Sequence, residues 1–289
     1  MKPRIFILAS VVCICALIAM GQSKKRPAPS PSPTPDLSWS TVYEEVKWQK
    51  GPSVGELGDA AQVKVADGYV FANARDTRLI MEANHNPTTG RELGFVAADG
   101  ENWFAVFEFS DVGYVKDDEK HSLDANALLD SIKDSTAAGN QERMKRGWPT
   151  MTVLGWETPP RYNELSHNLE WAIRAQSEGE PVINHNTRLL GRGGVMEVTL
   201  VVDPSLLAET MPKFQAMLDG FEYKKGHKYA EWRAGDKTAA YGLTGLIVGG
   251  GTAALVKTGA FKWIWKALVA AGVGVAALVK KLFSRRSEA

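Results

Sequence analysis

The chain has 289 residues, with 34 lysine and arginine residues, 33 aspartate and glutamate residues, and a formal net charge of +1. This nearly neutral balance argues against a nucleic-acid-binding protein, because such proteins normally carry a basic surplus. The only cysteines, Cys13 and Cys15, lie in an apolar N-terminal segment. The rest of the chain therefore has neither a structural disulfide nor a cysteine metal site.

The N-terminus has the parts of an export signal. Lys2 and Arg4 precede an apolar segment at 5–20, and small residues follow it. We therefore expect residues 1–21 to be a signal peptide or an N-terminal anchor. The cationic sequence KKR at 24–26 opposes translocation, so both alternatives stay open. In either case, the middle of the chain is expected outside the cytoplasm.

The chain then divides into a stalk, a domain and an apolar end. Residues 22–36 include RPAPSPSPTPD, in which alternating prolines favour an extended, semi-rigid linker. Residues 37–236 are long enough for one domain, which we expect to be extracytoplasmic. Residues 237–281 are largely apolar, and 282–289 form a basic tail.

The first half of the domain predicts strands and helices in alternation. Val63–Phe71 alternates as a strand, and Asn73 is a good cap for a short helix with Asp76 in its first turn. Leu93–Ala97 and Trp103–Phe109 flank an Asp-Gly pair and predict a hairpin. Asp124 next caps a longer helix that ends at a Lys-Arg-Gly sequence.

The second half predicts further strands and one more helix. A glycine turn joins two of the strands, and Pro212 lies inside the helix, which therefore kinks or begins late. Hairpins without helical crossovers indicate an α+β fold, with a mainly antiparallel sheet and helices packed on one face. The expected strands are Met151–Trp156, Leu169–Ala175, Val182–Leu190, Val195–Val202 and Phe221–Tyr223, and the helix carries Leu207, Met211, Phe214 and Leu218 on one face.

Two apolar stretches predict C-terminal membrane helices at about 239–256 and 261–279. One span would leave the basic tail in the cytoplasm, as the positive-inside rule favours, whereas two spans would return it outside. We favour two hydrophobic helices. Gly245 and Gly249 form a G-x-x-x-G pair, which predicts a helix hairpin or self-association.

Motifs that could carry chemistry all have simpler interpretations. The glycines at 191–194 precede a strand rather than a helix, which favours a tight turn over a phosphate site. Asp117, Asp118 and His121 could hold a metal ion for a hydrolase, but an acidic loop before the Asp124 helix is favoured. The chain lacks G-x-S-x-G, Walker and dinucleotide motifs. We therefore predict neither catalytic, metal nor cofactor-binding residues, and a protein that is not an enzyme.

A binding surface is the remaining candidate. The sequence GWETPPRY at 155–162 places aromatic residues on both sides of two prolines that are expected to break a strand. This segment is either a recognition loop or a rigid corner with Trp156 in the core. Arginines near the glycine turn could bind an anion, although lone arginines usually face solvent. The candidate surface comprises Trp156, Arg161, Tyr162, Arg188 and Arg192.

Several motifs together resemble a known family. They are GYVKDDE at 113–119 followed by LDANALL, GWETPPRY at 155–162, N-x-x-x-R-x-L-G-R-x-G-V at 184–195, and DKTAAYGL at 236–243. In this order they resemble the predicted membrane-anchored bacterial proteins grouped as domain of unknown function 2167. The resemblance covers nearly the whole chain after the stalk. It implies a bacterial envelope protein with an exported domain, and it transfers neither a cofactor nor a site residue.

The element order from Asp124 onward also resembles the small antiparallel fold of photosystem-P and Mog1-like proteins, an analogy of fold alone. The combined prediction is a non-enzymatic binding module at the bacterial plasma membrane, with its domain on the periplasmic side. Its expected partners are the lipid bilayer and an envelope protein, and not nucleic acid. The alternative is a metal-dependent envelope hydrolase that uses the Asp117–His121 cluster.

Overall fold

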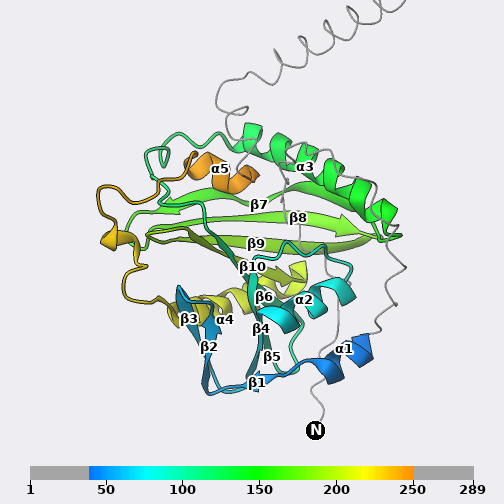
Figure 1. The fold of residues 1–289 in the computed structure, drawn as a ribbon. Coiled ribbons are helices and arrows are strands. Elements are labelled where there is room, and N and C mark those ends of the chain that lie inside the picture. Colours follow the sequence, from blue (N-terminus) through cyan, green and yellow to red (C-terminus); the bar gives the residue numbers. More distant parts are fainter. Residues whose placement is uncertain (1–38, 250–289) are drawn as a thin grey trace, which may run out of the picture.

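An antiparallel sheet of eight strands forms the centre of the fold, in a computed structural model that describes residues 39–249 (Figure 1). A second, three-stranded antiparallel sheet has the order β11-β3-β2. The α+β class with a large antiparallel sheet is therefore confirmed. In spatial order the large sheet contains β1 (Gln49–Lys50), β4 (Tyr69–Asn73), β5 (Glu92–Ala98), β6 (Trp103–Ser110), β10 (Val195–Val202), β9 (Glu180–Leu190), β8 (Asn168–Ser177) and β7 (Met151–Asn163). The small sheet contains β11 (Phe221–Tyr223), β3 (Ala61–Val65) and β2 (Ser53–Leu57).

Helices cover both faces of the large sheet, so the predicted packing on one face is wrong. On one face, Ile80, Leu128 and Leu246 share a core with Val106. On the other face, Phe214 packs with Phe107 and with the small sheet. The central strands bury residues of both parities, and both faces therefore need a cover. The first face carries α1 (Trp39–Glu45), α2 (Ala74–Ala83), α3 (Ala125–Lys145) and α5 (Leu243–Val248), and the second carries α4 (Leu207–Asp219).

Local signals placed most of these elements correctly. The side chain of Asn73 accepts a hydrogen bond from the Asp76 amide, and that of Asp124 accepts from two amides of α3. The expected hairpins β5–β6 and β9–β10 are both present. Pro212 lies inside α4, which begins at Leu207 after a 3-10 turn at Pro204–Leu206. A second 3-10 turn covers Tyr229–Glu231.

Two strand predictions were wrong. Val63–Phe71 is not one strand, because a turn at Gly68 separates β3 from β4 and sends them into different sheets. The prolines at 159–160 do not break β7, which continues to Asn163. They are tolerated because β7 is an edge strand, and its pairing with β8 shifts register around them.

Glycine is required where the β9–β10 turn meets β6. The predicted tight turn is confirmed, with a hydrogen bond of 2.9 Å from the Gly191 amide to the Gly194 carbonyl oxygen. A Cβ atom at Gly194 would lie 2.3 Å from the backbone oxygen of Ser110. Gly194 therefore allows the turn to pack closely against β6, and this close packing, rather than phosphate binding, accounts for the glycine.

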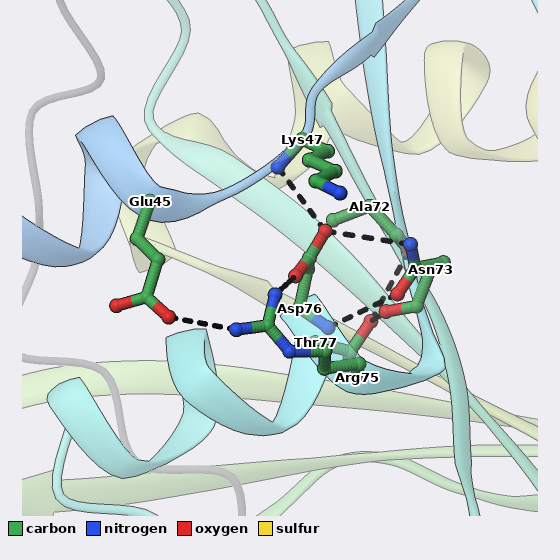
Figure 2. A network of polar contacts seen from close by, with 7 residues as sticks. All are labelled: Glu45, Lys47, Ala72, Asn73, Arg75, Asp76 and Thr77. Carbon is green, nitrogen blue, oxygen red and sulfur yellow. Dashed lines mark hydrogen bonds and ion pairs between the residues drawn. The ribbon is translucent and has the colours of Figure 1, made fainter.

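A buried carboxylate joins the first helix to the second (Figure 2). Asp76 is fully buried, and its Oδ2 accepts from the Lys47 amide at 3.1 Å and from Asn73 Nδ2 at 3.4 Å. Its Oδ1 accepts from Arg75 Nη1 at 3.0 Å, and Arg75 Nη2 donates to Glu45 at 2.8 Å. One side chain thus holds both the start of α2 and the segment that leaves α1.

The folded domain extends beyond the expected boundary at residue 236. The short helix α5 begins at Leu243, and its apolar side chains join the core beside α3. The predicted G-x-x-x-G pair does not form a helix face here, because Gly245 lies under Tyr241 and Gly249 ends α5 with φ 84°. Among residues 39–249, none of the helices is long and apolar enough to cross a bilayer. The predicted signal, stalk, second apolar helix and tail lie outside the described residues.

Candidate functional site

The five residues of the predicted binding surface do not form one surface. Trp156, Arg161 and Tyr162 lie on the edge strand β7, Arg188 lies in β9 and Arg192 in the turn after it. The Trp156 ring is half-buried against the core, and its Nε1 donates to the Ala125 carbonyl oxygen at 3.0 Å. Trp156 therefore anchors the start of α3 and packs against the core, as expected in the second alternative, although β7 continues without the expected corner.

Two arginines of the predicted binding surface, Arg161 and Arg192, have separate roles. Arg161 is exposed and pairs across the strands with Glu170. Burial raises the pKa of Glu170, and the charge of Arg161 opposes that rise. Arg192 donates from Nε and Nη2 to the two oxygens of Asp236 at 2.7 and 2.8 Å. That guanidinium holds the pKa of Asp236 at about 2 and is already occupied by a carboxylate.

Tyr162 belongs to a group of rings that we call the aromatic end. Tyr162 Oη lies 3.1 Å from His167 Nδ1, and the rings of His167 and Tyr229 have centroids 4.6 Å apart. The Tyr229 ring stacks on Tyr114 at 4.5 Å, and Tyr114 contacts Trp232 at 5.2 Å. The aromatic end is defined as Tyr114, Tyr162, His167, Tyr229 and Trp232.

The aromatic end combines apolar rings with hydroxyl donors. Four of its side chains are half-buried, and Trp232 is 40 % exposed. Tyr229 donates to the Val115 carbonyl oxygen at 3.0 Å. Burial raises the pKa of both Tyr162 and Tyr229, and the charge of Asp117 adds to the rise, so both hydroxyls stay protonated. Rings with one apolar face and one polar handle are suited to a binding surface.

The predicted acidic cluster lies on the rim of the aromatic end and does not converge. Lys120 bridges Asp117 at 3.8 Å and Glu164 at 2.8 Å, whereas exposed His121 lies 3.7 Å from Glu164. Glu119 turns inward, and its Oε2 accepts from the Thr244 amide at 2.9 Å. Within residues 39–249, there is no group of three or more histidine, aspartate or glutamate side chains that could hold a metal ion.

A buried row of charges crosses the face of the large sheet that carries α1, α2, α3 and α5, and the sequence predictions included its arginine but not its glutamates. Glu92, Glu108, Glu197 and Arg188 lie directly opposite one another on four neighbouring strands. We call this row the ionic ladder. The signal was present in the sequence, because Glu108 and Glu197 each lie inside a mostly apolar strand and Glu92 begins another.

Two arginines and one threonine tie the ladder together. Arg91 donates to Glu197 at 2.9 Å and lies 3.7 Å from Glu108. Arg188 lies 3.3 Å from Glu197, and its guanidinium carbon is 4.7 Å from the centre of the Trp171 ring. The Thr89 hydroxyl is 2.7 Å from Glu108 Oε1 and 3.0 Å from Glu92 Oε1.

The ladder holds more acid than base. Three carboxylates face two guanidiniums, and the single hydroxyl proton of Thr89 can serve only one of its two carboxylates at a time. Burial, with the charge of Glu197, raises the pKa of Glu108 to about 7. A protonated Glu108 makes the charges of the ladder cancel. The neutral acid can also donate to Thr89, which lets the second carboxylate accept from the threonine hydroxyl.

Comparison with solved structures finds chains of low similarity. Cyanobacterial PsbP from Synechocystis sp. PCC 6803 is 9% identical, covering 62% of this chain and 92% of its own, with a TM-score of 0.39. The Ran-binding protein Mog1p of Saccharomyces cerevisiae is 9% identical over 61% and 94% of the two chains, with a TM-score of 0.30. PA94 of Pseudomonas aeruginosa, a protein of unknown function, is 12% identical over 57% and 92%, with a TM-score of 0.24.

These scores are too low to support an argument about function, and the PsbP- or Mog1-like fold stays a prediction. None of the curated proteins compared with the chain matches it significantly. The profile of one family, described as protein of unknown function (DUF2167), matches residues 49–280. That range includes every motif on which the resemblance was based, and most of the chain. The chain therefore belongs to the DUF2167 family.

Proposed function

We propose that this protein is a non-enzymatic binding module, tethered to the bacterial plasma membrane with its domain on the extracytoplasmic side. The apolar N-terminal segment and the apolar stretches near the C-terminus support the tether. The aromatic end is proposed as the surface that binds an envelope protein. The exposure of Trp232, on a stack of rings contributed by separate segments, is the observation that carries this assignment.

The energetics favour a binding surface at these rings. Aromatic residues are enriched at the energetic centres of protein interfaces, where a polar rim surrounds them. Here Lys120, Glu164 and His121 form such a rim beside Tyr162. Covering Trp232 with a partner would remove apolar surface from water without moving the rings beneath it, which already support one another.

We expect Trp232→Ala to weaken partner binding by about 30-fold, the effect typical of a central interface tryptophan. The full-length protein would carry a photo-crosslinking residue at Arg233, an exposed neighbour of Trp232, and would be crosslinked in its native membrane. Mass spectrometry would then quantify each crosslinked protein. A partner retained at wild-type level by Trp232→Ala would overturn the assignment of this surface.

Trp148 provides a matched control. It is half-buried, its ring stacks on His85 at 5.7 Å, and Arg146 lies 4.8 Å from its centre. It thus resembles Trp232 in chemistry but belongs to a different group of side chains. Trp148→Ala should leave the crosslinked partners unchanged. Equal losses in both variants would indicate general destabilisation and would count against a local binding site.

A further inference from the structure

The chain between the domain and the predicted membrane anchor is held against the domain at several points. The Ala239 amide donates to the Tyr114 carbonyl oxygen at 2.9 Å, and the Tyr114 amide donates to the Lys237 carbonyl oxygen at 2.8 Å. Next along the chain, the Tyr241 ring covers Gly245, where a Cβ atom would lie 2.3 Å from the ring. The first residues of the uncharged run 239–256 are therefore part of the fold.

The start of α5 is fixed by the carboxylate of Glu119. Its Oε2 accepts from the Thr244 amide at 2.9 Å, one of the amides that a helix start leaves without a partner inside the helix. A Cβ atom at Gly242 would lie 2.8 Å from the carboxylate carbon, so glycine permits this close approach. Glu119 thus links the acidic loop, which was first considered as a metal site, to the last described helix.

The side chains of α5 make its docking strong. Leu243 and Val248 are fully buried, and Ile247 and Leu246 are 4% and 6% exposed. Lipid tails are about as apolar as these four side chains, so burial in the domain and burial in a bilayer remove the same surface from water. The domain alone adds polar contacts, from Glu119 to the Thr244 amide and between Tyr114 and both Lys237 and Ala239. Docking in the domain is therefore favoured over insertion as part of a membrane helix.

Docked α5 leaves too little apolar chain for two spans. After Val248, eight residues remain before Lys257. A membrane helix needs about 20 residues, and about 17 at the least. The stretch 261–279 has the required length, and Lys280 and Lys281 follow it directly.

We infer that the C-terminal anchor is a single span formed by 261–279, with Thr258 on the same side of the membrane as the domain and the tail on the other side. This inference rests on the proposed membrane tether. It differs from the two-helix interpretation of the sequence, because α5 withdraws the middle of the first apolar stretch into the domain core. A single span also places the basic tail opposite the exported domain, as the positive-inside rule favours.

Cysteine labelling can test this topology directly, since the natural cysteines are confined to Cys13 and Cys15. Both would be replaced by serine in the full-length protein. Single cysteines would then be introduced as Lys225→Cys on the exposed domain surface, Thr258→Cys before the span, and Ser287→Cys in the tail. Intact cells with a permeabilised outer membrane would be treated with a membrane-impermeant maleimide, before and after lysis.

We expect Lys225→Cys and Thr258→Cys to be labelled to the same extent in intact cells. Ser287→Cys should be labelled only after lysis, with at least a tenfold difference. Labelling of Ser287→Cys together with Lys225→Cys, while Thr258→Cys is protected, would establish two spans and overturn the inference without affecting the tether. Release of the protein by alkaline carbonate would overturn the tether and the span together.

Discussion

Asp76→Ala is expected to lower the free energy of unfolding by about 3 kcal/mol, because hydrogen bonds to a buried charged group are each worth about 1.5–3 kcal/mol. The carboxylate accepts from the Lys47 amide, from Asn73 and from Arg75 (Figure 2). Its removal leaves the Lys47 amide without this acceptor and opens a small void beside α2. Equilibrium denaturation by urea of the detergent-solubilised full-length protein would measure the change.

Glu45→Ala is the matched control for Asp76→Ala, since Glu45 belongs to the same network. Its carboxylate is 44% exposed and pairs with Arg75, whose side chain is 58% exposed. Exposed ion pairs contribute about 0–1 kcal/mol, so Glu45→Ala should change the unfolding free energy by less than about 1 kcal/mol. Similar losses in the two variants would contradict the central role of the buried carboxylate.

Glu108→Gln is expected to remove a marked pH dependence of stability. In the folded protein the pKa of Glu108 is about 7, against an ordinary value of 4.5, so the folded state holds this proton where the unfolded chain has lost it. Stability from this group is complete below about pH 4.5 and is lost as the pH rises through 7. At about 1.4 kcal/mol for each pKa unit, the loss is on the order of 3 kcal/mol.

Glutamine has the shape of the protonated acid and does not ionise. Between pH 5 and pH 8, the melting temperature of Glu108→Gln should therefore fall less than that of the wild type. At pH 8, the variant should have the higher melting temperature of the two. Glu56→Gln serves as the control, because Glu56 is 63% exposed and pairs with Lys224. If the curves of wild type and Glu108→Gln run parallel, the raised pKa of Glu108 is wrong.

The ionic ladder lies near α5, the last described helix of the domain. Tyr241 lies close enough to Glu197, Arg91 and Arg188 for their charges to act on its hydroxyl, although burial makes the largest contribution to the raised pKa of this tyrosine. The same ring packs over Gly245 of α5. The charged row and the docked helix are therefore neighbours, and both lie on the face that α3 covers.

The candidate site shows which parts of a surface a sequence can predict. Tyr162 was identified from its place in an unusual motif, but Tyr114, Tyr229 and Trp232 of the aromatic end come from other segments of the chain. Contacts of this kind depend on which strands pair and which loops fold over them, and local spacing does not encode that choice. The anion-binding alternative for Arg192 failed for the same reason, because Asp236 lies 44 residues further along the chain.

The sequence by itself determined the elements whose causes are local. Caps at Asn73 and Asp124, the glycine turn after β9 and the period of alternation in the strands depend on neighbours within a few residues. Family membership followed likewise from short motifs kept in order. Only the tertiary structure decided where α4 packs, why prolines are tolerated in β7, and how three glutamates and Arg188 align across four strands. It also decided where α5 lies. Apolar side chains are buried equally well in a protein core and in a bilayer, so the sequence of α5 does not choose between them. The contacts of α5 with α3 and Glu119 place it in the domain.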